Sequence, residues 1–486
     1  MWDDCGHALN IARLRGATYS DVRVMHQRQR VLTTKNGRVG TLGESESLGL
    51  GIRVVSSGAW GFASTDNLTR DGVAGCAAQA VAIAKASALA KKEPVQLAPE
   101  GIYIDSWQGP CLKDPFEIPV ETQLNLLLAV DAEMAKVKGV TLTETDMQFR
   151  KVDSWFASSA GSRIHQRKYV SGCGIVAMSF QGDALQKRSY PNSFGGQYIL
   201  GGHELIEAME LLRHAPPCAA QRLLRRRAAQ CPEGPRTLIL GGSQLGLQIH
   251  ESVGHPIELD RVLGQEANFA GTSFLTRDKL HNLRYASPIV NVVADARIEH
   301  GPGLGTFAYD DEGVPAQRIE VIKDGEFHGY LSSRETAHLV GLSRSGGTMR
   351  TESWNRLPMI RMTNVSILPG QWTLENLIAD TDDAILMDTN RSWSIDDRRY
   401  HFQFSTEIAW EIKGGKKIRM LKNPSYSGIT TEFWNSCDAI CDADEWVLWG
   451  TPNCGKGQPM QVMGTGHGAS PARFRNVKIG MAFAKP

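Results

Sequence analysis

The residues of this sequence best suited to catalysis are the six of His250-Glu251-Ser252-Val253-Gly254-His255, which follow an apolar, helix-like stretch. Neutral imidazole is the commonest metal ligand in proteins, and a glutamate beside a ligand histidine can act as a base toward water. The two histidines are five residues apart. On a regular helix this spacing separates them by about 140°, whereas the HExxH spacing of four separates them by about 40°. Both histidines can therefore reach one ion only if the helix widens by a π-bulge or ends near Gly254.

The residues around the second histidine make an end to the helix plausible. Gly254 tolerates the left-handed conformation of a helix cap, and Pro256 cannot continue a helix. Two histidines and a glutamate on a solvated surface helix would nevertheless give the same local pattern. The motif alone thus leaves a metal site and a surface helix open.

A catalytic zinc usually has three protein ligands and one open position, so the motif needs a third ligand from elsewhere. Glu258 and Asp260 are close in sequence, but carboxylates that follow a helix are commonly surface groups. Cys454 is the other candidate, because a thiolate is a strong zinc ligand and its Asn and Gly neighbours predict a loop that can approach closely. A buried cysteine is also common as plain core, so the residues alone do not decide.

Three other groups were candidates for chemistry. His467, in a glycine-rich stretch, fits either a group that supports the ligands or contacts the substrate, or an exposed loop histidine. The run Asp310-Asp311-Glu312-Gly313 is too short for a calcium loop and predicts a turn, although it could line a site that binds a peptide amine. Cys437 and Cys441 lack the second pair that a structural zinc site needs, so we expect ordinary thiols.

Composition restricts the class of protein. The chain has 486 residues, 42% of them apolar, which predicts two or three domains. Lys plus Arg (53) nearly balances Asp plus Glu (52), so we expect no nucleic-acid partner. No apolar run reaches the ~18 residues of a membrane span, and the N-terminus lacks a signal-peptide pattern. Nine cysteines without a framework pattern fit a reducing cytoplasm.

Residues 1–231 predict an N-terminal α+β domain with an antiparallel sheet and helices on one side. The hairpin turn Ser56-Ser57-Gly58 joins two of its strands, and Thr65, Asp66 and Asn67 offer N-caps for a long helix that reaches about Lys91. Pro216-Pro217 is expected to break the last helical stretch. The other predicted helices are Asp4–Arg15, about Val120–Lys138, His203–His214 and Cys218–Gln230, and the strands are Asp21–His26, Gln29–Thr34, Ser47–Val55, Ala59–Ala63, Thr141–Lys151, Ser154–Ala160, Ser162–Tyr169 and Gly172–Gln181.

Residues 232–486 predict a β-rich C-terminal domain that carries the metal-binding helix near its start. Pro232-Glu233-Gly234-Pro235 is the best boundary signal in the chain, and Ser243 is a candidate N-cap for that helix. The predicted strands are Arg236–Leu240, Ile289–Ala294, Ala316–Lys323, Phe327–Tyr330, Ile360–Ile367, Ala384–Asp388, Phe402–Lys413 and Lys417–Leu421.

Blocks spread over most of the chain resemble the TldD branch of the TldD/PmbA family of metalloproteases. Their order and spacing agree with the family, which is more specific than any single motif. The blocks are GAWGFASTDNLT, HESVGHPIELD, YDDEGVPAQRIEVIKDGEFHGYL, RMTNVSILPG and CGKGQPMQVMGTGHGASPARFRNVKIGMA.

The resemblance implies a zinc peptidase with His250, His255 and Cys454 as Zn²⁺ ligands and Glu251 as the general base. It implies unfolded or extended peptides as substrates, as in leader-peptide or antitoxin processing. It also implies a homodimer or a heterodimer with a PmbA/TldE-type paralogue; members of that partner branch usually lack the HExxxH motif, which this chain keeps. The alternatives are an inactive scaffold subunit and a zinc hydrolase of a non-peptide amide.

Overall fold

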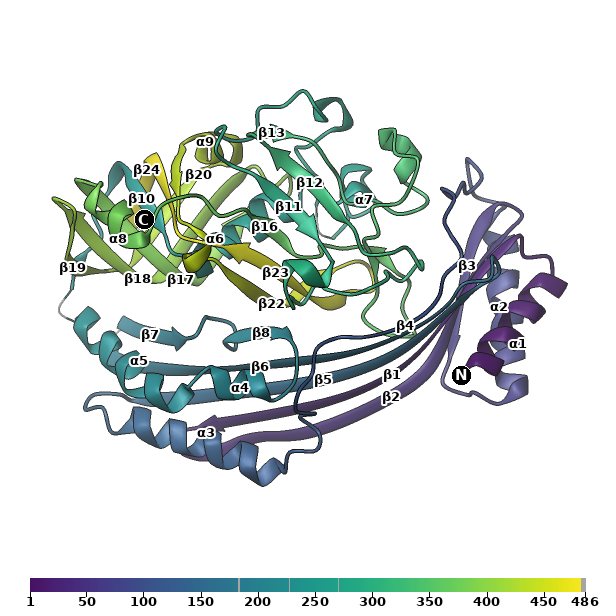
Figure 1. The fold of residues 1–486 in the computed structure, drawn as a ribbon, viewed down its shortest axis with the longest axis horizontal. Coiled ribbons are helices and arrows are strands. Elements are labelled where there is room, and N and C mark those ends of the chain that lie inside the picture. Colours follow the sequence, from purple (N-terminus) through teal and green to yellow (C-terminus); the bar gives the residue numbers. More distant parts are fainter. Residues whose placement is uncertain (182–183, 227, 270, 482–486) are drawn as a thin grey trace.

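Two large β-sheets organise the computed structural model, which describes residues 1–181, 184–226, 228–269 and 271–481. The first sheet is long and curved, and the C-terminal part of the chain packs over its inner side (Figure 1). Helices accompany both sheets, so the predicted α+β class, with an antiparallel N-terminal sheet and a β-rich C-terminal part, is confirmed.

The N-terminal sheet has the order β3-β2-β1-β5-β6-β4, with β7 and β8 also paired to β6. All of its pairings are antiparallel except that of β4 with β6. Its strands are β1 (Tyr19–Lys35), β2 (Arg38–Ser56), β3 (Ala59–Thr65), β4 (Ile104–Gln108), β5 (Leu142–Ser158), β6 (Arg163–Gln181), β7 (Ala184–Tyr190) and β8 (Gln197–Leu200).

The strands of this sheet are longer than the sequence predicts. The predicted strands Asp21–His26 and Gln29–Thr34 are parts of β1, and the four predicted strands between Thr141 and Gln181 are parts of β5 and β6. The polar residues between the apolar runs do not end the strands, because they keep their partners in the ladder, as Gln27 does opposite Val152. The predicted hairpin at Ser56-Ser57-Gly58 is confirmed, since β2 and β3 pair across it.

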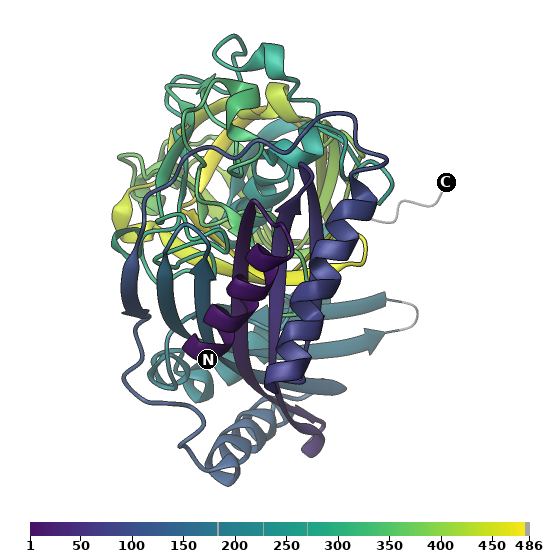
Figure 2. The ribbon, with the colours of Figure 1, turned by 90° about the vertical axis from the view of Figure 1, so that its right-hand side faces the viewer.

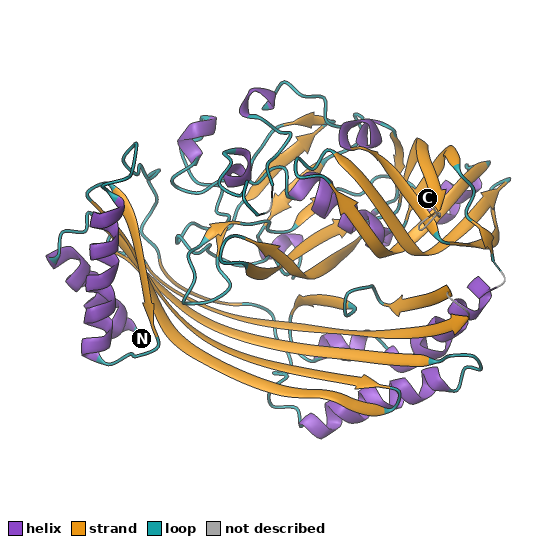
Figure 3. Ribbon diagram, turned by 180° about the vertical axis from the view of Figure 1, so that it is seen from behind, coloured by secondary structure: helices purple, strands orange, loops and turns teal. Residues whose placement is uncertain are grey.

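Helices cover the outer face of the curved sheet at both of its ends (Figure 3). At one end, α1 (Trp2–Leu14) and α2 (Arg70–Ser87) lie side by side against the strands (Figure 2). At the other end lie α3 (Val120–Ala135), α4 (Glu204–Ala208) and α5 (Leu211–Arg226). Alternation along β1 explains the arrangement, because Val22 and Val24 are buried under the helices while Gln27 and Gln29 face the inner side.

Two predictions about these helices were wrong. The cap of α2 is Thr69, whose side chain accepts a hydrogen bond from Gly72 N, rather than one of Thr65–Asn67. Helix α5 runs through Pro216-Pro217 instead of breaking there. Ala215, Cys218 and Ala219 are buried against the sheet, and this packing offsets the backbone hydrogen bonds that the prolines cannot make.

The second large sheet closes on itself. Pairings run from β17 through β10, β24 and β20 to β18, and β18 pairs again with β17. These strands are β17 (Asp383–Ile395), β10 (Gly234–Leu240), β24 (Ala472–Met481), β20 (Pro424–Ile429) and β18 (His401–Lys413), extended by β19 (Lys416–Lys422), β9 (Ala229–Gln230) and β21 (Cys437–Ile440). A large hydrophobic core packs inside this ring and around helix α6 (Gly242–Ile249).

Smaller elements complete this part of the molecule. One four-stranded sheet contains β13 (Glu326–Phe327), β12 (Arg318–Lys323), β11 (Val292–Asp295) and β16 (Val365–Ile367), and two hairpins join β14 (Met349–Arg350) with β15 (Met359–Ile360) and β22 (Val447–Lys456) with β23 (Gln461–Ala469). The remaining α-helices are α7 (Leu259–Val262), α8 (Leu374–Ala379) and α9 (Thr430–Asn435). The predicted strand Ile360–Ile367 is interrupted, since β15 ends at Ile360 and β16 begins at Val365. Among the described helices, none has both the length and the apolarity to span a membrane.

Candidate metal centre

A π-helical turn places the two motif histidines on one side of a buried helix. Helix α6 continues directly into the π-helix η1 (His250–Gly254), and His255 N donates to His250 O over 3.1 Å. This i→i+5 bond places His255 one turn above His250. The π-bulge, rather than an end to the helix at Gly254, therefore brings the two histidines, five residues apart, to the same side of the helix. Ser243 is not the N-cap; α6 begins after Gly241, and Ser243 Oγ donates to Asp388.

Gly254 is required by close packing. A Cβ at this position would lie 2.0 Å from the sulfur of Met362, far inside van der Waals contact. Met362 is fully buried beside the π-turn. Only glycine therefore fits at residue 254, because the segment that carries Met362 leaves no space for a Cβ.

Cys454 reaches the histidines from strand β22, not from the loop that the sequence predicts. Its register with β23 is irregular between Thr451 and Cys454, and Cys454 stands opposite Met463. The bulge turns the cysteine toward the helix, where Sγ lies 3.7 Å from His255 Nε2. Arg361 Nη2 donates to the Cys454 carbonyl over 2.5 Å and anchors the strand at this point.

The ligand atoms of His250, His255 and Cys454 all lie within 4.8 Å of one another, and the three residues are buried. Two ligands of a tetrahedral zinc are about 3.5 Å apart, given bonds of about 2.0 Å to nitrogen and 2.3 Å to sulfur. The 3.7 Å between His255 and Cys454 is close to that value. Three ligands leave one position of a tetrahedral ion for water, so a His₂Cys donor set fits a catalytic zinc.

His467 fixes the orientation of His250. His467 Nδ1 lies 3.0 Å from the carbonyl oxygen of Val365 and must donate to it, because a carbonyl oxygen only accepts. The other ring nitrogen, Nε2, therefore accepts from His250 Nδ1 at 2.7 Å. His250 is left with its Nε2 lone pair, the atom that a metal requires. His467 is fully buried on β23, so the exposed-loop interpretation is wrong.

Glu258 fixes the orientation of His255. The Glu258 carboxylate accepts from His255 Nδ1 at 2.9 Å, which leaves His255 Nε2 toward Cys454. Lys456 lies 3.4 Å from Glu258 and donates to Asp260 over 2.7 Å. Both acids are buried, so neither is the surface group that the sequence suggests, and neither belongs to the cluster of three ligand atoms.

Glu251 is buried beside the ligands and paired with a residue that sequence reasoning did not single out. Arg399 Nη1 donates to Glu251 Oε2. Arg399 lies between β17 and β18, 148 residues along the chain, and Thr430 Oγ1 donates to its backbone carbonyl over 2.8 Å. No local motif marks this arginine, and only the folding of the second large sheet brings it to the Glu251 carboxylate.

Burial shapes the ionisation of the three ligands. It lowers the pKa of His250 and of His255 to about 4, which leaves both imidazoles neutral near pH 7. Burial alone would raise the pKa of Cys454, but the Arg361 guanidinium and His255 outweigh it and lower the pKa. Burial raises the pKa of each of the other eight cysteines, for example to about 12 for Cys441. Cys454 is thus the cysteine whose lowered pKa favours the thiolate form that binds a metal.

The other candidate residues make contacts that stabilise the fold. Cys437 and Cys441 are free, buried thiols, as expected. Asp310 forms the predicted turn by accepting from the backbone N–H groups of Glu312 and Val314. Glu312 pairs with Arg53 of the N-terminal sheet.

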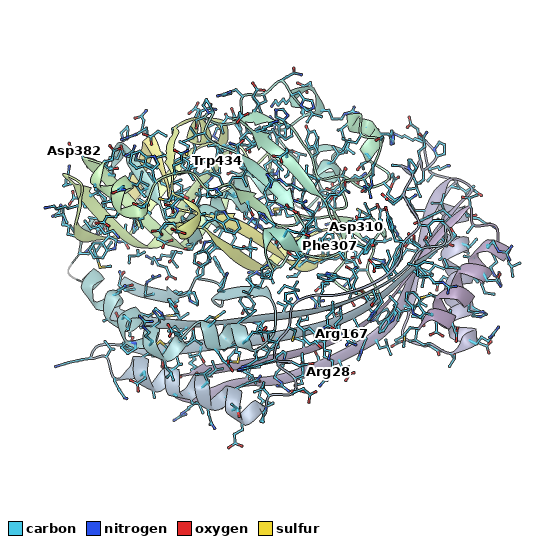
Figure 4. All side chains as sticks on the ribbon, viewed as in Figure 1. Arg28, Arg167, Phe307, Asp310, Asp382 and Trp434 are labelled. Carbon is cyan, nitrogen blue, oxygen red and sulfur yellow. The ribbon has the colours of Figure 1, made fainter. Side chains whose placement is uncertain are left out.

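A cavity of about 840 Å³ lies between the curved sheet and the C-terminal part. Phe307 and Asp310 mark its upper wall at the seam of the two parts (Figure 4). Asn453, the neighbour of Cys454, also lines it, so the cavity adjoins the strand that carries the thiol.

Family models cover most of the chain. The model described as the PmbA/TldA metallopeptidase C-terminal domain matches residues 234–480, and the model described as PmbA/TldA metallopeptidase domain 1 matches residues 20–84.

Curated relatives carry metalloprotease names. The chain is 29% identical over 454 residues to metalloprotease MJ0996 of Methanocaldococcus jannaschii, which covers 93% of this chain and 95% of the relative. It is 27% identical to a protein of Haemophilus influenzae named metalloprotease TldD homolog, over 85% of this chain and 83% of the relative. A protein of Saccharolobus solfataricus named zinc metalloprotease TldD homolog is 22% identical, over 87% of this chain and 89% of the relative.

Solved structures share the whole fold. A crystal structure from Thermotoga maritima matches with a TM-score of 0.78 at 15% identity and covers 99% of this chain and 100% of the other. TldE from Thermococcus kodakarensis matches with a TM-score of 0.75 at 15% identity and covers 98% and 100%.

Proposed function

The chain belongs to the PmbA/TldD family of metallopeptidases and is a metalloprotease of that type; from this premise we propose that it is a zinc-dependent peptidase of unfolded or extended peptides. His250, His255 and Cys454 are the metal ligands, and Glu251 is the general base. The observation that carries the proposal is the buried His₂Cys cluster, within 4.8 Å, in which two internal hydrogen bonds leave both Nε2 atoms free.

Zinc bound there would supply Lewis-acid chemistry, which polarises a scissile carbonyl and lowers the pKa of water. The Glu251 carboxylate takes the proton of the attacking water and delivers it to the leaving amine. Arg399 holds this carboxylate in place through its Nη1 hydrogen bond. His467 and Glu258 hold the imidazoles in the tautomer that can bind a metal.

We also propose the two domains, the dimer and the cytoplasmic location that the sequence predicts. Residues 1–231 form one domain and residues 232–486 the metallopeptidase domain, although β9 (Ala229–Gln230) already pairs with β19 of the second. A dimer with itself or with a PmbA/TldE-type paralogue is supported by the likeness to TldE. Nine free cysteines support a reducing compartment such as the cytoplasm.

Removal and return of metal tests the proposal. Purified chain, alone and with a PmbA/TldE-type partner, is treated with a chelator and given an unstructured peptide. We expect cleavage to stop and to return with about one equivalent of zinc. Cleavage that persists in metal-free protein would contradict the proposal, and a zinc-loaded chain that cuts no peptide in either state would favour the scaffold alternative.

A further inference from the structure

The cavity between the curved sheet and the C-terminal part is lined by cations that have no ion-pair partner in the described part of the chain. Lys168 and Arg150 reach it from β6 and β5, where Lys168 pairs with Val152 and Arg150 with Val170. This register places the two cations on the same face of the sheet as diagonal neighbours. Arg350 lines the cavity from the opposite side.

These three cations have no carboxylate within ion-pair distance among the described residues. Arg150 donates to the backbone carbonyl of Glu352 over 2.7 Å, and Arg350 donates to the carbonyls of Met362 and Leu304. A guanidinium has five N–H donors, so each arginine keeps further donors for a ligand.

The acids that line the cavity are engaged elsewhere. Asp311 accepts from Thr351 N over 2.6 Å, and Glu352 accepts from Val462 N over 3.1 Å. Asp310 accepts from Met349 N over 3.0 Å, and Asp146 accepts from the hydroxyl of Tyr198 over 2.6 Å. Each of these acids thus accepts at least one hydrogen bond from a protein donor, and none forms an ion pair with the three cations.

The pKa of Lys168 is lowered to about 8, chiefly by burial. The charge of Asp311 opposes this shift, and repulsion from Arg350 and Arg150 adds to it. Burial likewise lowers the pKa of Arg350 to about 10. An anion in the cavity would relieve this repulsion.

The cavity also lies next to the metal centre. Asn453 and Met463 line it, and they are the chain neighbour and the strand partner of Cys454. A volume of about 840 Å³ accommodates several peptide residues. The inference takes this space as the place where a peptide cut at the centre extends.

We propose that this cavity binds a carboxylate of the peptide substrate, held by Lys168, Arg150 and Arg350. The inference rests on the proposed peptidase function and adds a substrate class, peptides that carry an anionic group near the cleaved bond. The carboxylate is either the C-terminus of the peptide or an acidic side chain, since both offer the same two oxygens.

Peptide binding to zinc-loaded, full-length Glu251→Gln protein separates this inference from catalysis. Three fluorescent, unstructured peptides are compared by anisotropy: one with a free C-terminal carboxylate and no acidic side chain, its C-terminal amide, and the amide with one internal Glu. We expect at least one anionic peptide to bind about 10-fold more tightly than the neutral amide. A preference for the first peptide identifies the C-terminus, and a preference for the third identifies a side chain.

Charge variants test the site. Lys168→Gln should remove the preference, Lys168→Arg should retain it, and Lys417→Gln, which removes an exposed lysine on β19, should leave it unchanged. Equal affinity for all three peptides, no binding of any, or a preference that survives Lys168→Gln in folded protein would overturn the inference. A preference that persists in protein whose wild type cuts no peptide would instead refute the proposed function alone.

Discussion

His250 and His255 each use Nδ1 for a hydrogen bond within the protein, to His467 and Glu258 respectively. Both rings consequently direct Nε2 to the same space as the Cys454 thiol. At the residue scale, then, the centre depends on the partners that orient its ligands as well as on the ligands.

The first prediction concerns His467. In His467→Ala the His250 ring loses its acceptor, so zinc affinity should fall by about 10–100-fold, measured by competition with a chelator. His203→Ala removes a buried histidine from the N-terminal part and serves as the control. Equal zinc affinity of wild type and His467→Ala would show that His467 does not orient the ligand.

The second prediction concerns the thiol. Cys454→Ala removes one of three ligands, so the zinc retained per chain after dialysis under reducing conditions should fall well below that of wild type. Cys441→Ala also deletes a buried thiol, but one whose pKa burial raises to about 12, and should keep its zinc. If both variants lose the same amount of metal, or neither does, Cys454 is not a ligand.

Single residues were predictable to different degrees. The sequence singles out His250, Glu251 and His255, because their types and spacing are local, and it leaves Cys454 among several third ligands. It predicts His467 only as one of two alternatives and gives no sign of Arg399. These residues are 217 and 148 positions from their partners, and only the tertiary fold determines such contacts.

At the scale of elements, the π-turn η1 is the feature that makes a five-residue spacing workable. The sequence poses this problem and offers two solutions, but the choice depends on packing outside the motif. Met362 fills the space that a side chain at residue 254 would need, and Tyr285 and Trp434 donate to the backbone and side chain of Ser252 in the middle of the turn.

The third prediction concerns this turn. Gly254→Ala places a Cβ 2.0 Å from the Met362 sulfur, so overpacking should cost about 1–3 kcal/mol and lower the melting temperature. Gly75→Ala in helix α2, where a Cβ meets nothing within 4 Å, should raise stability by about 1 kcal/mol. A Gly254→Ala protein that melts like wild type and binds zinc normally would mean that the turn is less tightly packed than we describe.

The lengths of the strands were less predictable than their existence. The two faces of β1 carry successive residues in alternation. Around Gln27 both faces are polar, because Gln27 and Gln29 line the cavity while Arg28 and Arg30 lie over the ring of Phe116 on the other face. This stretch therefore looks like a strand end in the sequence, although β1 continues through it.

At the scale of the whole molecule, residues of the curved sheet and of the C-terminal part together line the cavity, and neither part forms it alone. Long-range pairs such as Arg53 with Glu312, at 3.2 Å, join the two parts. No sequence pattern could reveal this cavity, because its cations come from three separate segments.

The fourth prediction concerns pH. Lys168 is charged below its pKa of about 8 and faces Asp311, Arg150 and Arg350. As the pH rises from 7 to 9 the lysine loses its proton, so the affinity of Glu251→Gln protein for an anionic peptide should fall, while that for the amide should not change. A bound carboxylate raises the lysine pKa, so the loss should come at or above pH 8. A fall of equal size for both peptides would point to a different group.

The most direct test of the account compares wild type with Glu251→Gln in two measurements on the same preparations, zinc per chain and cleavage of an unstructured peptide. Glutamine keeps the size of the side chain and removes the carboxylate that takes the proton. We predict about one zinc per chain in both proteins and a rate of cleavage at least ~10²-fold lower in the variant. Undiminished cleavage by Glu251→Gln, with zinc bound, would contradict the assignment of this centre as the site of peptide hydrolysis.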